Sequence, residues 1–263
     1  MKIKRILSLM LRHFYLIKGS FPRIFDLIYW PTVQIILWGF VSKFFTLYSS
    51  YFGNAVGVIL TAAILYDFLF RSSISYNMLF LEEIWSRNLI NLFVSPLRSS
   101  EVICALTSTA LLRTLLGLVP AVFIAMPLFN ISIFELGLPL YLLLLSLYMF
   151  GITLGLLVTA GLIRFGPSFE NVAWASLFFI APLGCIYYPV DILPDWIRPL
   201  ALSFPLAHIF EEMRSILVNN TVNYINIFLA IGLNIFYIGL GVSIFYKAYK
   251  SAKNKGTLVN IGE

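Results

Sequence analysis

Charge is scarce in this sequence, and long stretches of it carry none. Only 11% of the 263 residues are Asp, Glu, Lys or Arg, whereas an ordinary soluble domain has about 25%. Two runs hold no ionised side chain: 28 residues in Leu136–Ile163 and 32 residues in Ser215–Tyr246. Because a helix needs roughly 20 apolar residues to cross a bilayer, this deficit excludes an ordinary soluble domain and predicts an all-α membrane protein.

Patterns that mark catalysis or metal binding are missing as well. The sequence has two histidines and lacks a phosphate-binding glycine loop, a zinc-binding histidine pair and a nucleophile elbow. Cys104 and Cys185 lie in apolar runs, which is typical of small packing residues rather than a disulfide or metal pair. We therefore expect no enzyme activity, cofactor or metal in this chain. The net charge of +6 is attributed to basic residues that flank spans rather than to nucleic-acid binding.

Six apolar segments predict one domain over residues 1–263 with six transmembrane helices. The predicted spans are about 27–47, 55–80, 101–126, 136–162, 171–187 and 223–246. Between the last two, residues 188–221 hold four prolines and only short apolar stretches. This composition predicts two short re-entrant helices on the extracytoplasmic side, at about 195–203 and 205–218.

The first 26 residues mix basic and apolar side chains at helical spacing. One predicted face is apolar and the other is basic, so we expect an amphipathic helix lying in the membrane interface against lipids. The apolar face comprises Ile3, Ile6, Leu7, Met10, Leu11 and Phe14, and the other face Lys2, Lys4, Arg5, Arg12 and His13. His13 is expected to be solvated or to lie among lipid headgroups.

The distribution of Lys and Arg predicts the orientation. Six lie in the N-terminal segment, two between spans two and three, one after span four and four in the tail 247–263, which makes thirteen on one side. The other side has three: Lys43, Arg198 and Arg214. Since basic residues favour the cytoplasmic side, we expect a multi-pass protein of the plasma membrane with both termini in the cytoplasm.

A few charged residues fall inside predicted helices, where they need a partner or water. Asp67 and Arg71 are four residues apart and are interpreted as an ion pair on one helix face. Arg113 lies twelve residues beyond Glu101, roughly 18 Å along the helix. We predict that Arg113 pairs with Asp67 across spans two and three as a structural clamp. The alternative is that Arg113 attracts an anionic substrate.

Two patterns concern packing within the spans. Gly151 and Gly155 are four residues apart in the fourth span, a spacing that allows close helix contact. Phe40, Phe44 and Tyr48 recur on one face of the first span. This stripe either lines a substrate path or packs against lipid and neighbouring helices, and the sequence leaves both readings open.

The polar segment 82–98 stands out between spans two and three. A mixed helix is predicted over 82–94, with Pro96 stopping it. The residue pattern fits two roles equally: a structural elbow, or a handle by which a partner pushes on the two spans.

A resemblance favours the second role. The pattern E-E-x-W-x-R-N-L-x-x-L-x-V-S-P-L-R at 82–98 resembles the coupling region of ABC-2 type transporter permeases, the membrane subunits of type V ABC exporters. Residues 184–214, from Gly-Cys-Ile-Tyr-Tyr-Pro to the final Glu-x-x-Arg, resemble the outer segment that precedes the last span in the same family. The two matches occur in the family's order, and the likeness covers essentially the whole chain.

The resemblance implies a permease that dimerises, with each copy bound to one copy of a separate ABC ATP-binding subunit. That subunit would bind ATP and Mg and drive export.

 The residues that match the ATPase-coupling contact are Glu82, Glu83, Trp85, Arg87 and Asn88. Those that match the outer gate are Tyr187, Tyr188 and Pro189.

A second class of function stays open at this point: a secondary transporter or channel that acts without an ATPase and uses Asp67 and Arg113. Such proteins usually carry ion-coupling carboxylates at mid-membrane, often in paired repeats, and only Asp67 qualifies here. A membrane-embedded enzyme is not favoured, because no cluster of His, Asp or Glu is seen. Polysaccharide, lipid, drug, peptide and ion all remain possible substrates.

Overall fold

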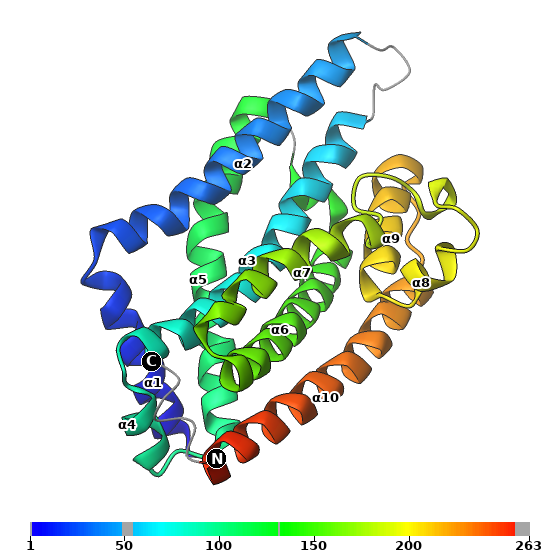
Figure 1. Ribbon diagram of the computed structural model, residues 1–263. Helices are drawn as coiled ribbons and strands as arrows, with labels where there is room; N and C mark the ends of the chain where they lie inside the picture. The colour runs from blue at the N-terminus through cyan, green and yellow to red at the C-terminus, as the bar shows by residue number, and fades with distance from the viewer. Residues whose placement is uncertain (1, 49–54, 131, 256–263) are drawn as a thin grey trace.

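The computed structural model describes residues 2–48, 55–130 and 132–255, and within these ranges the chain is helical, with no strand (Figure 1). The helices are α1 (Ile3–Lys18), α2 (Phe21–Tyr48), α3 (Ala55–Trp85), α4 (Leu89–Val94), α5 (Ser99–Phe129), α6 (Pro139–Phe165), α7 (Glu170–Leu183), α8 (Arg198–Leu202), α9 (Pro205–Asn219) and α10 (Tyr224–Lys255). Short 3-10 turns occur at η2 (Ile133–Leu136), η3 (Pro167–Phe169) and η4 (Val190–Ile192).

Among the described residues, five helices are long and apolar enough to cross a membrane: α2, α3, α5, α6 and α10. The segment predicted as span 171–187 contains α7, which has only 14 residues. At 1.5 Å per residue α7 is about 21 Å long, shorter than the roughly 30 Å apolar core of a bilayer. A multi-pass membrane protein is therefore supported by five helices, and α7 is not one of them.

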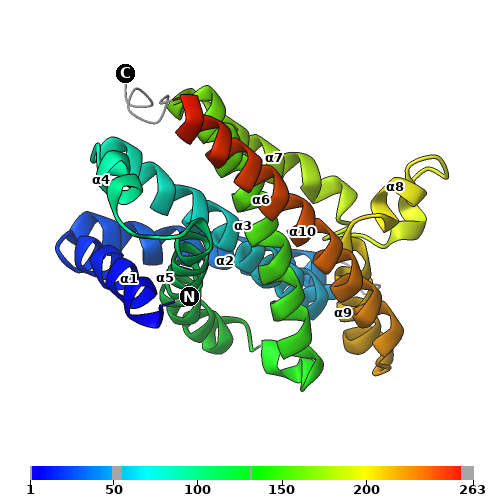
Figure 2. The same cartoon turned by 90° about the horizontal axis from the view of Figure 1, so that it is seen from below.

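The helices are arranged between two ends of the molecule (Figure 1). At the end that we call the α1 end, Leu9 of α1, Leu92 of α4 and Tyr249 of α10 belong to one buried cluster. At the opposite end, the α9 end, Leu136 of η2 and Phe210 of α9 belong to another. Figure 2 shows α10 beside α6 and α1 beside α5, in agreement with their extensive contacts.

Close contact between α3 and α6 lies at the centre of the bundle. A Cβ atom on Gly151 would stand 2.9 Å from the Cβ of Ser72, and one on Gly155 would stand 2.9 Å from the Cβ of Tyr76. Such distances are shorter than packed side chains tolerate, so both positions need glycine. The prediction that Gly151 and Gly155 allow close helix contact is confirmed.

Helix α1 is present and amphipathic, but one residue of its predicted polar face, His13, is buried against the rest of the protein. Ile3, Leu7 and Phe14 are exposed on its outer side, where an interfacial helix would meet lipid. Its inner side buries His13 completely. The expectation that His13 is solvated or among headgroups is therefore wrong, because His13 lies with Leu9 and Ile17 on the side of α1 that packs against the bundle.

Two other predicted features can be located. Phe40 and Phe44 are exposed on α2, and the side chain of Tyr48 lies outside the described part of the chain. Within 188–221, where short helices were predicted, the structure has α8 and α9.

Candidate functional site

The segment after α3 does not form the single helix predicted over 82–94. Helix α3 continues through Glu83 to Trp85, a turn follows at 86–88, and α4 begins at Leu89. Arg87 adopts φ 52°, the left-handed conformation that often ends a helix. The N–H of Asn88 then donates to the carbonyl oxygen of Glu83 at 3.0 Å, so the turn is closed onto the last turn of α3.

Glu83 is the centre of this junction. Its side chain is 1% exposed and accepts hydrogen bonds from Arg12 Nε at 3.0 Å and from a terminal nitrogen of Arg12 at 3.1 Å. It also accepts from Nδ2 of Asn88 at 2.6 Å. A bidentate guanidinium pair is among the stronger polar contacts in proteins. Glu83 therefore ties α1, α3 and the 86–88 turn to one another.

The neighbouring carboxylate, Glu82, binds α5 instead. Both terminal nitrogens of Arg113 lie 3.3 Å from Oε1 of Glu82, and each side chain is 8% exposed. Asp67 pairs with Arg71 on its own helix at 3.0 Å, as predicted, so the predicted clamp between Arg113 and Asp67 is wrong.

The reason for the different pairing is the relative height of the two helices. Arg113 is fourteen residues past Ser99, the first residue of α5, and it lies level with the end of α3. Asp67 lies fifteen residues before Glu82 on α3, roughly 22 Å away along the helix axis. The side chain of Arg113 is too short to reach Asp67 across that distance.

His13 lies between the two glutamates. Its Nδ1 is 3.9 Å from Oε2 of Glu82 and its Nε2 is 3.5 Å from Oε1 of Glu83. Neither ring nitrogen has a hydrogen-bond partner among the described residues. Burial lowers the pKa of His13 below its usual value, the two carboxylates oppose this shift, and Arg113 and Arg12 reinforce it. Neutral His13 thus sits in a group of two anions and two cations, which we call the junction cluster: Arg12, His13, Glu82, Glu83 and Arg113.

A third glutamate attaches the first turn of α1. Oε1 of Glu101 accepts the backbone N–H of Lys2 at 2.8 Å, and Oε2 accepts that of Arg98 at 3.1 Å. Arg5 lies 3.6 Å from the same carboxylate and also donates to the carbonyl oxygen of Pro96. Glu101 therefore holds the start of α1 to the start of α5, and Glu83 holds the middle of α1 to α3.

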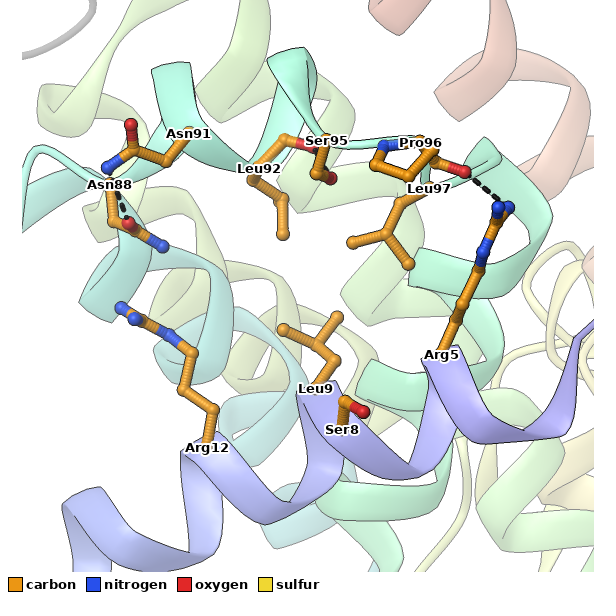
Figure 3. A pocket seen from close by; sticks show the side chains of 10 residues that line it. All are labelled: Arg5, Ser8, Leu9, Arg12, Asn88, Asn91, Leu92, Ser95, Pro96 and Leu97. Atoms are coloured by element: carbon orange, nitrogen blue, oxygen red, sulfur yellow. Dashed lines mark hydrogen bonds between the residues drawn. The ribbon is translucent and has the colours of Figure 1, made fainter.

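A pocket of about 320 Å³ lies between α1 and the segment 88–97. Figure 3 shows Leu9 pointing from α1 toward Leu92, with Arg5 and Arg12 on either side of it. The pocket is thus an apolar slot flanked by two cations. It is lined by Arg5, Ser8, Leu9, Arg12, Asn88, Asn91, Leu92, Ser95, Pro96 and Leu97.

The five residues matched to an ATPase contact do not share one accessible surface. Trp85 is 56% exposed, Arg87 is exposed, and Asn88 is half-buried. Glu82 and Glu83 are held inside the junction cluster and are unavailable to a partner. The sequence missed this division because the partners of both glutamates, Arg12 and Arg113, lie on other helices.

The residues matched to an outer gate lie at the α9 end. The ring of Tyr187 stacks on Trp38 of α2 with centroids 4.4 Å apart. The hydroxyl of Tyr188 donates to the carbonyl oxygen of Pro182 at 2.6 Å, and Pro189 is exposed.

Two residues of α9 that the sequence did not single out hold this bend. Arg214 donates to the carbonyl oxygens of Cys185 at 2.9 Å and Ile186 at 3.2 Å. Glu211 accepts the backbone N–H of Val190 at 2.6 Å and pairs with Arg214 at 3.1 Å. Cys185 has φ 50°, so the chain turns sharply here and exposes carbonyl groups to Arg214. The available signal was an Arg three residues after a Glu on a predicted short helix.

The chain matches no family model and no curated protein. Among the described residues, no group of three or more His, Cys, Asp or Glu is placed to hold a metal ion. The geometry of the junction cluster and of the adjoining turn is therefore the main support for a function.

Proposed function

We propose that this chain is the transmembrane permease subunit of an ATP-driven exporter of the ABC-2 type, coupled to a separate ATP-binding subunit through the segment 82–98. One observation carries the proposal: Trp85, at the end of α3, and Arg87, in the turn that follows, are both exposed, and hydrogen bonds between Glu83 and Asn88 close this turn onto α3. The sequence resemblance at 82–98 assigns a coupling role to the same turn.

The position of this turn allows movement of a bound partner to be transmitted to the transmembrane helices. The segment 86–98, which contains this turn and α4, connects α3 and α5, each of 31 residues and therefore about 46 Å long. The Glu82–Arg113 pair links these two helices a second time. In this proposal a force on Trp85 and Arg87 moves α3 and α5 together with α1, because the pairs Arg12–Glu83 and Glu82–Arg113 hold the three helices to one another.

The rest of the arrangement follows from the same proposal. Two copies of the permease form a homodimer in the plasma membrane, and ATP and Mg are bound by the partner subunits. The sixth crossing is made by α7 together with the residues that follow it to position 187, so that both termini are cytoplasmic and the α1 end faces the ATPase. Tyr187, Tyr188 and Pro189 lie near the outer gate.

One observation favours the second candidate, a secondary transporter or channel. Asp67 is wholly buried, and its Oδ1 has no hydrogen-bond partner among the described residues. A carboxylate in that state is typical of an ion site in a membrane protein. Arg113, the other residue of this hypothesis, is engaged by Glu82 instead.

Purification of the tagged protein from its native membranes in mild detergent tests the proposal. We expect an ATP-binding subunit in stoichiometric amount, lost from Trp85→Ala and Arg87→Glu. Neither side chain is part of the junction cluster, so both variants should stay folded. Arg198→Glu, on exposed α8, is the matched control and should retain the subunit. A folded homo-oligomer without any ATPase would contradict the proposal and favour the Asp67 hypothesis.

A further inference from the structure

A second, larger cavity of about 650 Å³ lies among α2, α3, α5 and α7. Its volume is within the usual range for small-molecule sites, roughly 300–1,000 Å³. Its walls are aromatic, and three of the five tryptophans in the chain line it. The aromatic lining residues are Trp30, Phe70, Trp85, Trp174 and Phe178.

Cations outnumber anions on the cavity wall. Arg23, Arg71 and Arg113 line it, against Asp26 and Glu82. Each arginine comes from a different helix: α2, α3 and α5. The guanidinium groups on the cavity wall are therefore supplied by three separate helices.

The arginines also have hydrogen-bond donors to spare. A guanidinium carries five N–H groups, but among the described residues Arg71 donates only through Nε, to Asp67. Arg113 directs both terminal nitrogens at a single oxygen of Glu82. The Nε of Arg113 is buried without a hydrogen-bond partner among the described residues, and the whole residue is only 7% exposed. Buried donors of this kind call for an oxygen-rich partner.

Two of the arginines lie at the same level. Helices α2 and α5 run in register, because a Cβ on Gly117 would meet Leu27 and one on Gly39 would meet Phe129. Applying the same offset of ninety residues, Arg23 is level with Arg113. Arg23 donates only to the carbonyl oxygen of Leu16 among the described residues, so its guanidinium also has donors left.

The middle of the cavity is apolar. On α3, Ile74 and Met78 line it between Arg71 and Glu82. Those two charged residues are eleven positions apart, roughly 16 Å along the helix. The cavity therefore presents a charged end, where Arg23 and Arg113 lie with the two acids Asp26 and Glu82, and a long aromatic and aliphatic wall that leads to Arg71.

We propose that this cavity binds an amphiphile whose phosphate-bearing head lies at the Arg23 and Arg113 end and whose apolar body lies along the aromatic wall. A phosphate offers several acceptor oxygens to guanidinium groups from different helices. That this amphiphile is the exported substrate rests on the proposed function, whereas its binding does not require an ATPase.

Intrinsic tryptophan fluorescence of the purified chain in phosphatidylcholine nanodiscs reports on the site, because Trp30, Trp85 and Trp174 line it. Three probes with the same dodecyl tail are compared: dodecyl phosphate, dodecyltrimethylammonium and dodecyl maltoside. We expect a saturable change with dodecyl phosphate alone. Equal responses to all three probes, a response to the cation alone, or no saturable response would each overturn the proposal.

The variants separate the head site from the fold. Arg23→Gln removes no described ion pair, and we expect it to weaken dodecyl phosphate binding about tenfold or more, as for a lost charged hydrogen bond. The neutral pair Glu82→Gln with Arg113→Gln should weaken it similarly without leaving a buried charge. Arg198→Gln, at the α9 end, is the control and should change affinity less than about twofold. Unchanged affinity in both Arg23→Gln and the neutral pair would overturn the proposal.

A second arm identifies the source of the amphiphile. If phosphatidic acid added to the nanodiscs abolishes the probe signal, the site takes a bilayer lipid; if the signal persists, it takes a separate amphiphile. Either result supports the site. Binding that persists in a chain without a co-purifying ATPase would leave the cavity assignment standing and remove only the exporter proposal. A co-purifying ATPase together with no saturable probe binding would remove only the cavity assignment.

Discussion

The α1 end and the α9 end are both held by charged side chains, but the partners differ. At the α1 end, Glu83 bonds Arg12, which is 71 residues away in the chain, and Glu82 bonds Arg113, 31 residues away. At the α9 end, Arg214 and Glu211 bond backbone groups no more than 29 residues away. Side-chain pairs between separate helices make a joint that moves as a unit, whereas bonds to one backbone segment fix its local shape. The α1 end is thus built to connect helices, and the α9 end to brace a bend.

The largest effect is expected from Arg113→Ala, which leaves the buried carboxylate of Glu82 without its cation. Removing one partner of a buried pair costs about 3–5 kcal/mol, which thermal unfolding in detergent would measure. Adding Glu82→Gln should restore most of the loss, whereas adding Asp67→Asn should not. Rescue by Asp67→Asn instead would show that the pairing described for Arg113 is incorrect.

Glu83→Gln should have the next largest effect and should act on α1. The amide cannot replace the charged bidentate pair with Arg12, a loss of about 1.5–3 kcal/mol; because Arg12 is 38% exposed, we expect the lower part of that range. Protease cleavage at Gly19, between α1 and α2, should accelerate about tenfold. Cleavage within 188–196 should not change, and equal acceleration at both sites would refute the separation of the two ends.

A smaller and local effect is expected at the α9 end. Arg214→Gln removes the ion pair with Glu211 and shortens the side chain that donates to the 185–186 carbonyls, at a cost of about 1 kcal/mol. Hydrogen exchange should become faster at Val190 and neighbouring amides, while the amides of the 86–88 turn keep their protection. Loss of protection at the turn would mean that the two ends are not independent.

The smallest effect is a pH dependence at His13. Because burial lowers its pKa in the folded protein, the unfolded chain binds the proton more readily. The contribution of His13 to stability is therefore present above about pH 6.5 and is lost as the pH falls below that value, by at most about 1.4 kcal/mol per pH unit. The melting temperature should fall between pH 7 and pH 5.5, and His13→Gln should reduce the fall. A melting temperature that rises in wild type over this interval would contradict the assignment.

Much of the helical plan was predictable because it depends on composition along the chain. The charge-free runs located α6 and α10, and the spacing of Gly151 and Gly155 located a close helix contact. Helix α7 ends at Leu183, four residues before the predicted end of the span 171–187, and the chain bends at Cys185. Apolar composition alone does not reveal such interruptions.

The junction cluster was not predictable, for a different physical reason. Sequence spacing gives the height of a residue on its own helix but neither the relative height nor the rotation of two helices. Arg113 was therefore assigned to Asp67 instead of Glu82, and His13 to the solvent instead of the interior. The left-handed residue Arg87 divided a segment whose residue pattern favoured one continuous helix.

The most direct test of the proposed coupling places a photo-reactive amino acid at one end or the other of the protein and identifies the crosslinked neighbour in the native membrane. Trp85 at the α1 end is 56% exposed and Trp196 at the α9 end is 80% exposed, so either position can reach a neighbour. A photo-crosslinking residue at position 85 should give an adduct with an ATP-binding protein, and one at position 196 should not. An ATP-binding protein captured at neither position, or at 196 alone, would contradict the assignment of the 82–98 segment as the coupling region.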